Sequence, residues 1–156
     1  MITLQFVAMN DPASEAIRLF ERGWPSHVDA VLPGGLLGAR SDTIGGKPPG
    51  VQLRALDYEA FDKRLLVHLP ATPDIEARFL AFLQSQLGKP YDKLAIAAFA
   101  VGRDWRTPDA WFCSELVAAA LEQSGWFPAP LSNAANEITP RDLLLAVSPW
   151  ADKAAA

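Results

Sequence analysis

The spacing of apolar residues changes near Pro73, and this change limits the fold more than any other feature of the chain. Before Pro73, short apolar runs alternate with polar residues or are bounded by Gly and Pro, as is typical of strands. After it, apolar residues recur three and four positions apart, as is typical of helices. The pattern predicts an α+β domain in which a small antiparallel sheet packs against helices.

The first half of the chain predicts strands at 4–8, 51–54 and 64–69, and a helix at 11–23 that begins with Asp-Pro. Apolar runs at 24–32 and 36–42 flank a Pro-Gly-Gly turn and predict a hairpin. His27 opens the first strand of this hairpin and Asp42 closes the second. Antiparallel pairing about the turn therefore brings His27 and Asp42 to the same end.

The second half predicts helices at 75–87, 94–101 and 113–121, and a last one from Thr139-Pro140 to residue 146. Residues 43–50 are rich in Gly and Pro and predict a loop, either a plain connection or the rim of a site at the end of the hairpin. The length of 156 residues suits one domain, which we expect to span 1–150. Residues 151–156 are expected to form a frayed tail.

Composition excludes several classes of function. A net charge of −4 gives no electrostatic basis for binding nucleic acid. A single cysteine cannot form an internal disulfide, and one Cys with two distant His residues makes a poor zinc set. We therefore expect neither cofactor nor metal.

The N-terminus favours a cytoplasmic protein as encoded. It lacks the basic and long apolar regions of a signal peptide, and the longest apolar run, 94–102, is too short to span a bilayer. Delivery to the cell envelope by another route stays open. The sequence does not indicate an oligomeric state.

The only cysteine, Cys113, precedes an apolar helix within the run Trp-Phe-Cys-Ser-Glu-Leu-Val at 111–117. In the first helical turn, unpaired backbone N–H groups and the positive end of the helix dipole would favour its thiolate. Cys113 is thus a candidate nucleophile. The alternative is a small buried residue that packs one face of the helix.

A cysteine nucleophile needs a base within hydrogen-bonding distance, and a third group that orients the base. His27 lies at the mouth of the hairpin, beside Ser26. His68 lies within a strand close to Pro70, where a histidine is more often structural. His27 is therefore the preferred base.

Three motifs follow one another along the chain: Ser-His-Val at 26–28, Gly-Lys-Pro-Tyr-Asp at 88–92 and Phe-Cys-Ser-Glu-Leu-Val at 112–117. In this order they resemble the circularly permuted branch of the NlpC-like papain-fold superfamily, the YiiX/YaeF-type proteins. These are distantly similar to lecithin:retinol acyltransferases. In the non-permuted cell-wall peptidases, the cysteine helix precedes the histidine strand. The resemblance covers 26–121, and it implies that 1–150 form a papain-like catalytic domain.

The resemblance also implies site residues. Cys113 would be the nucleophile and His27 the general base, and Asp42 best matches the third, polar residue of the family. Asp29 is the alternative third residue, because it lies two positions after His27 and points to the same face of the strand. Relatives usually carry Gly at that position, so Asp29 departs from the family pattern.

Four residues are candidates for substrate binding: Ser26, Tyr91, Trp105 and Trp111. Tyr91 matches a tyrosine typical of the family, although packing on the core at a helix start explains it equally well. The resemblance implies a thiol hydrolase that cleaves an amide bond, of a cell-wall peptide or an N-acyl compound, through an acyl-enzyme. The alternatives are a lipid-directed acyltransferase or thioesterase, and a catalytically silent binding or structural module, possibly phage-associated. The expected partner is thus a peptide, peptidoglycan or acyl-lipid substrate.

Overall fold

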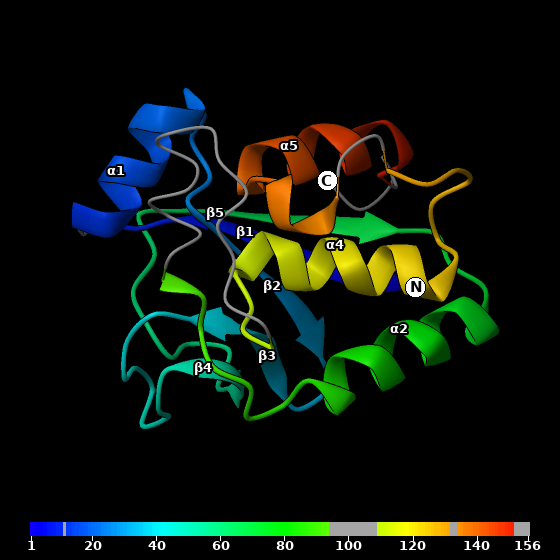
Figure 1. The fold of residues 1–156 in the computed structure, drawn as a ribbon, viewed down its shortest axis with the longest axis horizontal. Coiled ribbons are helices and arrows are strands. Elements are labelled where there is room, and N and C mark those ends of the chain that lie inside the picture. The colour runs from blue at the N-terminus through cyan, green and yellow to red at the C-terminus, as the bar shows by residue number, and fades with distance from the viewer. Residues whose placement is uncertain (11, 94–108, 132–133, 152–156) are drawn as a thin grey trace.

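The computed structural model describes residues 1–10, 12–93, 109–131 and 134–151 (Figure 1). Its strands are β1 (Ile2–Ala8), β2 (His27–Leu32), β3 (Gly35–Arg40), β4 (Gly50–Arg54) and β5 (Lys63–Leu69). Its α-helices are α1 (Pro12–Glu21), α2 (Pro73–Ser85), α4 (Cys113–Ser124) and α5 (Pro140–Val147), and its 3₁₀ segments are η1 (Ala135–Glu137) and η2 (Ser148–Trp150). The α+β class and the antiparallel sheet predicted from the sequence are confirmed. The predicted helix at 94–101 lies outside the described residues.

The five strands form one antiparallel sheet in the order β4-β3-β2-β1-β5. The predicted hairpin is β2 and β3, joined by a two-residue turn at Pro33-Gly34, with Leu32 paired to Gly35. Since β4 and β5 lie at opposite edges of the sheet, the connection between them, residues 55–62, has to cross it. This crossing brings Tyr58 to the middle of the sheet.

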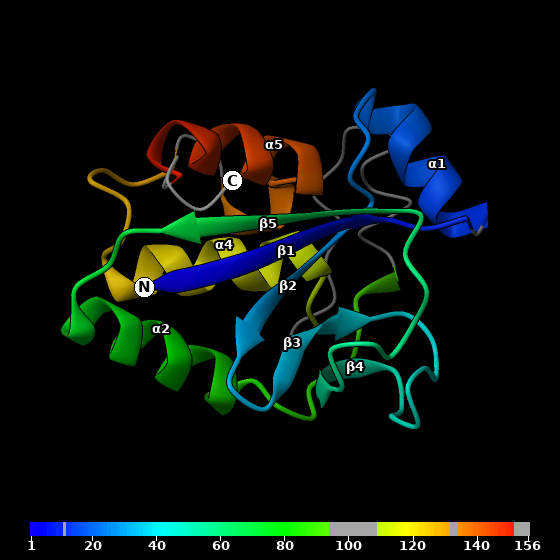
Figure 2. The ribbon, with the colours of Figure 1, turned by 180° about the vertical axis from the view of Figure 1, so that it is seen from behind.

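One face of the sheet is apolar and carries the core. Alternate residues of the strands, among them Phe6, Val28, Ala30 and Leu37, pack with the helices in one buried cluster. Full burial of a large apolar side chain contributes roughly 1.5–3 kcal/mol to stability. Helix α4 packs against β2 and β3, and from behind, β1 and β5 lie in front of it (Figure 2).

Residues typical of helix ends flank α2, α4 and α5, although α2 begins two residues before and ends two residues before the predicted bounds, 75–87, and α4 runs three residues past the predicted end at 121. Thr72 caps α2 by accepting a hydrogen bond from the Ile75 N–H at 3.3 Å, and Thr139 caps α5 in the same way through Asp142. Gly125 ends α4 in the left-handed conformation with φ 75°. Helix α4 packs against both α2 and α5 and lies between them in Figure 1. The cysteine helix is therefore the central helix of the layer.

The opposite face of the sheet carries buried polar residues around Asp29, whereas residues 63–66 of the edge strand β5 are exposed. Gln5, Asp29 and Arg54 are at most 2% exposed. Buried polar groups destabilise a fold unless they are paired, so this face needs a matching set of partners. None of the helices in the described part of the chain is long and apolar enough to cross a bilayer.

Candidate functional site

A histidine and an aspartate form a buried pair at the start of β2. His27 and Asp29 are two residues apart on one strand, so both side chains point to the same face of the sheet. His27 Nε2 lies 2.8 Å from Asp29 Oδ1, and the residues are 3% and 1% exposed. The two atoms lie within hydrogen-bonding distance, but the ring N–H does not point directly at Oδ1, so the contact is close and poorly aligned.

Two other residues fix the Asp29 carboxylate. The Tyr58 hydroxyl donates a hydrogen bond to Asp29 Oδ2 at 3.0 Å. On β3, Gly38 leaves the space that the carboxylate occupies, because a Cβ atom at this position would lie 1.9 Å from Oδ1. Asp29 is therefore held between a donor on one side and a bare backbone on the other.

Two arginines balance the negative charge on this face. The Arg40 guanidinium donates to Glu59 Oε2 at 2.5 Å and to Met9 Sδ at 2.9 Å, and lies over the Tyr58 ring at 5.4 Å. Arg54 donates to the Gly38 carbonyl at 3.2 Å. Buried charges are tolerated where such partners surround them.

The surroundings set the protonation of the pair. Burial lowers the pKa of His27; Asp29 opposes this change, whereas Arg40 and Arg54 add to it. Burial by itself would raise the pKa of Asp29, but His27, Arg40 and the Tyr58 hydrogen bond outweigh it, and the pKa is lowered. At neutral pH the pair is therefore a carboxylate beside a neutral imidazole, which is the form that can accept a proton.

His27 borders a pocket of about 130 Å³ at the end of the sheet, and Asp29 lies behind it, outside the pocket lining. Its lining is mostly polar and includes His27, Asp42 and Tyr91; the other lining residues are Met9, Ser14, Ile17, Ser26, Ala39, Arg40, Ser41, Ile44 and Glu59. Since a water molecule takes about 30 Å³ of liquid, a pocket of this size holds a few waters or one side-chain-sized group.

Tyr91 links the pocket to the start of α4. The segment after α2 is tied to β4 by hydrogen bonds from Gly88 N to Val51 O and from Val51 N to Lys89 O, both 2.9 Å. Tyr91 then forms a parallel bridge with Trp111, and its ring lies 5.8 Å from that of Phe112. Burial, followed by the charge of Cys113, raises the pKa of Tyr91.

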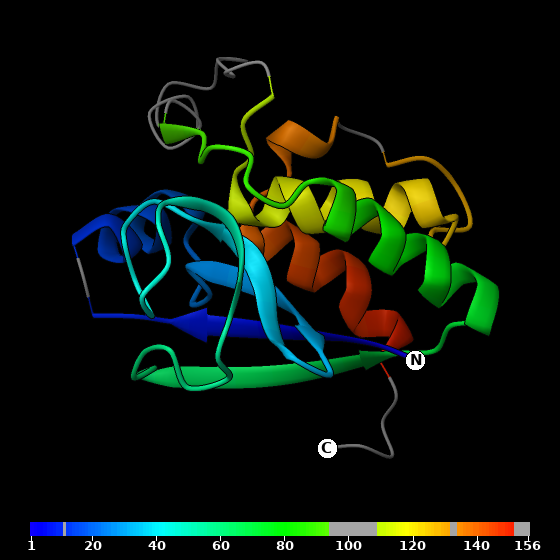
Figure 3. The ribbon, with the colours of Figure 1, turned by 90° about the horizontal axis from the view of Figure 1, so that it is seen from below.

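Cys113 is the first residue of α4 and is 1% exposed, within the buried cluster. Glu115 Oε2 accepts the Phe112 N–H at 3.1 Å in the first turn of the helix. Ser114 donates to the Ile138 carbonyl at 2.6 Å and so is held by the segment that leads to α5. The start of α4 lies beside the start of β2 in perpendicular views (Figures 1 and 3), and the two elements pack together.

Arg40 and Tyr91 connect the two parts of the candidate site. Burial opposes the charge of Arg40, but Tyr58, Asp29, Glu59 and Cys113 together raise its pKa. Arg40 therefore interacts electrostatically with Cys113 and also lowers the pKa of His27. Both Arg40 and Tyr91 line the pocket that His27 borders.

The third residue proposed from the sequence does not contact the histidine. The hairpin does bring His27 and Asp42 to one end, as predicted, and both line the pocket. However, β3 ends at Arg40, so Asp42 lies in the following loop, is exposed and accepts a hydrogen bond from Ser41 Oγ at 2.7 Å. The carboxylate against His27 belongs to Asp29, the alternative.

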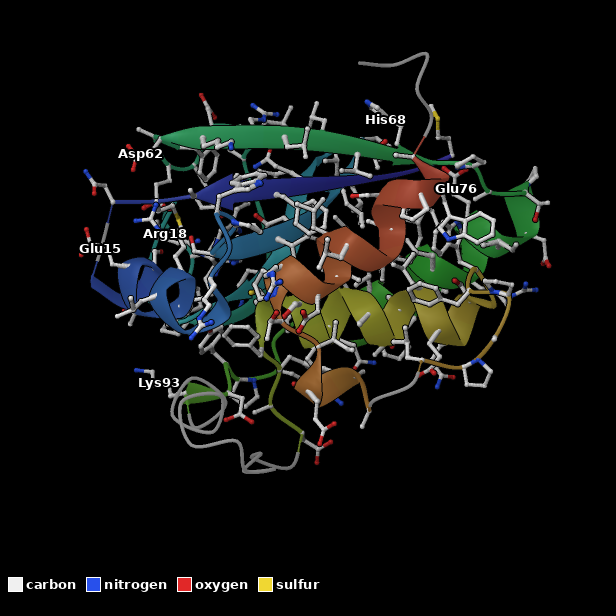
Figure 4. The ribbon with its side chains drawn as sticks, turned by 90° about the horizontal axis from the view of Figure 1, so that it is seen from above. Glu15, Arg18, Asp62, His68, Glu76 and Lys93 are labelled. Atoms are coloured by element: carbon white, nitrogen blue, oxygen red, sulfur yellow. The ribbon has the colours of Figure 1, made fainter. Side chains whose placement is uncertain are left out.

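The proposed substrate-binding residues have different positions. Ser26 is buried, lines the pocket and donates its N–H to the Val7 carbonyl at 2.9 Å. Trp111 packs toward α2, where its Nε1–H donates to Gln86 at 3.1 Å. Trp105 lies outside the described residues. His68 lies on β5 (Figure 4), paired with Thr3, four residues along β1 from the Val7 partner of His27.

Four residues of the polar face were not predicted from the sequence: Gly38, Arg40, Arg54 and Tyr58. A glycine inside a strand often indicates that another group approaches the backbone closely, so Gly38 carried a usable signal. Tyr58 carried none, because its contact depends on the path of a loop. Within the described residues, no three His, Cys, Asp or Glu side chains are grouped so that they could hold a metal ion.

Comparisons with models of protein families and with curated proteins both find no match for this chain.

Proposed function

We propose that the protein is a cysteine hydrolase that cleaves an amide bond through an acyl-enzyme. Cys113 is the nucleophile, His27 the base and Asp29, in place of Asp42, the residue that orients the base. The observation that carries the proposal is the buried contact between His27 and Asp29, with His27 on the wall of a pocket at the end of the sheet where α4 begins. The family resemblance of the three motifs agrees with it.

In the first half of the reaction, the Cys113 thiol gives its proton to His27, and the sulfur attacks the carbonyl carbon. The carbonyl electrons move to oxygen, where N–H groups at the start of α4 would stabilise the charge. When the intermediate collapses, the C–N bond breaks and His27 donates the proton to the leaving amine. The acyl group then remains on Cys113 as a thioester.

Water completes the reaction. His27 takes a proton from it, the resulting hydroxide attacks the thioester, and the C–S bond breaks to release a carboxylic acid and the thiolate. Asp29 lies against Nε2, so Nδ1 is the ring nitrogen left to exchange protons with Cys113 and water. A third group that fixes the ring in this way is the usual support for a histidine base.

The lining of the pocket favours a peptide over an acyl chain. Ser14, Ser26, Arg40, Asp42 and Glu59 supply hydroxyls and charges, which can bind the polar groups of a peptide. A fatty acyl chain would displace water from these groups without offering them any hydrogen bond in exchange, at a cost in free energy. We therefore place a cell-wall peptide or an N-acyl compound ahead of a lipid ester.

A binding module without catalysis is the second candidate, and the burial of Cys113 favours it. At 1% exposure within an apolar cluster, the cysteine has the surroundings of a packing residue. A buried thiol of this kind is inert, whereas a catalytic one reacts rapidly near neutral pH. The two candidate functions therefore predict different reactivities of the Cys113 sulfur, which can be measured.

The proposal is tested with purified wild type and Cys113→Ala, each incubated with a muropeptide digest and, separately, with p-nitrophenyl butyrate. Wild type should release new amine and carboxyl ends from the muropeptides, and Cys113→Ala should release none while unfolding at the same urea concentration. Hydrolysis of the ester alone would support the lipid-directed alternative. Equal activity of the two proteins would refute the cysteine mechanism.

A further inference from the structure

We propose that Tyr58 and Gly38 are positioning residues that hold the Asp29 carboxylate against His27, one by a hydrogen bond and the other by its missing side chain. Their effect on catalysis rests on the function proposed above. Their effect on the His27–Asp29 pair does not, because the pair is present whatever the protein does.

Tyr58 is itself fixed in position. Its ring contacts the edge of Phe61 with centroids 5.5 Å apart, and the Arg40 and Arg54 guanidinium groups lie 5.4 and 5.9 Å from its centroid. Cations over an aromatic face are attracted to it. The hydroxyl is thus directed to Asp29 Oδ2 by a ring that is held by side chains of β3 and β4 and by Phe61 of its own segment.

Gly38 acts through space alone. Its φ is not in the left-handed region, so the backbone does not require a glycine there. The Asp29 carboxylate requires a glycine at position 38, because its Oδ1 lies only 1.9 Å from the place where a Cβ atom would be. A methyl group at position 38 would therefore push Oδ1 away from His27 Nε2.

The cross-strand neighbour of Asp29 on β1, Gln5, does not donate a hydrogen bond to the carboxylate. Gln5 is paired with Asp29 across β1 and β2 and is fully buried. Neither atom of its amide group has a hydrogen-bond partner among the described residues. Tyr58 is thus the donor that the described residues supply to Oδ2.

If Tyr58 and Gly38 served packing only, their substitution would leave the pKa of His27 unchanged. If they position Asp29, the two substitutions should shift that pKa in opposite directions. The charged groups that act on His27 are Asp29, Arg40 and Arg54, and the other titratable groups that line its pocket are Asp42, Glu59 and Tyr91. Tyr58→Phe removes a donor from Asp29, concentrates its charge on the imidazole and should raise the pKa of His27. Gly38→Ala moves the carboxylate away and should lower it.

The test follows the imidazole ring protons of His27 by NMR as a function of pH. The chain has two histidines, so His68→Gln identifies the His27 signal, and all variants are made in that background. We expect a higher His27 pKa in Tyr58→Phe and a lower one in Gly38→Ala, in the same direction as Asp29→Asn. No shift in either variant, with the fold intact, would overturn the proposal.

A double-mutant comparison covers the case in which Gly38→Ala merely weakens the fold. In an Asp29→Ala background there is no carboxylate to displace, so Gly38→Ala should change neither the His27 titration nor the urea midpoint appreciably. An equal loss in both backgrounds would show that Gly38 serves packing only.

Activity gives the last readout. Tyr58→Phe should lower kcat about tenfold and leave KM nearly unchanged, because the hydroxyl acts on the base and not on the substrate. If Cys113→Ala still cleaves substrate, the proposed function fails while the titration shifts stand. If catalysis depends on Cys113 but the titrations do not shift, the positioning role fails alone.

Discussion

At the scale of single residues, the geometry of a strand decides which carboxylate supports His27. Side chains two positions apart lie on one face, and the 2.8 Å contact with Asp29 follows from that spacing. Asp42 lies past the end of β3, where no strand pairing fixes it, and it is exposed. The two aspartates therefore have different surroundings, although both are near His27.

Replacing each aspartate by asparagine tests which of the two carboxylates orients His27. Asp29→Asn should lower kcat by roughly 100-fold or more, because the orientation of the base is lost. Asp42→Asn should change kcat less than about threefold, since the altered group is exposed to solvent. Initial rates at saturating substrate measure both. The opposite ranking of the two variants would restore Asp42 as the third catalytic residue.

The buried pair also predicts how stability depends on pH. Burial holds the folded-state pKa of His27 below its usual value near 6.5, so between these two values the unfolded chain binds more protons than the folded one. Stability from His27 is therefore full above pH 6.5 and is lost as pH falls through that range. The lowered pKa of Asp29 adds a further loss as pH falls below about 4.

Urea unfolding of wild type and His27→Gln between pH 4 and 8 measures this dependence. The wild-type midpoint should fall on acidification below pH 6.5, and His27→Gln should remove most of the fall between pH 5 and 6.5. Parallel curves for the two proteins would contradict the assigned protonation of His27.

At the scale of elements, the junction between β4 and the segment after α2 positions Tyr91. Gly50 has φ +108°, and an ideal Cβ there would lie 2.3 Å from the Lys89 carbonyl oxygen. Gly88, in the same junction, has φ +82° but no heavy atom within 4 Å of its Cβ position. Both glycines have a positive φ that disfavours other residues, but only Gly50 would bring a Cβ atom against a backbone carbonyl.

Substituting both glycines isolates that contact. Gly88→Ala should cost about 1–2 kcal/mol, from its left-handed backbone alone. Gly50→Ala should cost at least about 1 kcal/mol more, because the methyl group also meets a carbonyl that the junction cannot move freely. Urea unfolding gives both values. Equal losses would show that the contact with Lys89 is easily relieved.

The elements that could be predicted from the sequence are those with a local signal. The change of apolar spacing at Pro73 and the Thr139-Pro140 pair marked two helix starts, and the Pro-Gly-Gly turn marked the hairpin. Asp29 was recognisable as a same-face partner of His27 by its spacing. The end of β3 at Arg40 was not predictable to within two residues, and that error placed Asp42 on a strand.

At the scale of the whole molecule, one face of the sheet carries the apolar core, and the other, the charged face, carries the buried polar groups around Asp29. The apolar face packs with α4 and gives the domain its core. On the charged face, the chain between the two sheet edges brings Tyr58 to Asp29, a contact between residues 29 positions apart. Such long-range contacts depend on the order of the strands, so a single sequence does not reveal them.

The central claim is that Cys113 and His27 act as one unit, and the alkylation of Cys113 by iodoacetamide tests it most directly. The chain has a single cysteine, so intact mass reports one site, with His68→Gln as a matched histidine control. We expect rapid alkylation of wild type and His68→Gln below pH 8, where a free thiol of pKa about 8.5 reacts slowly, and a rate at least about tenfold lower in His27→Gln. Equal rates with and without His27, or alkylation only after unfolding in urea, would contradict the account.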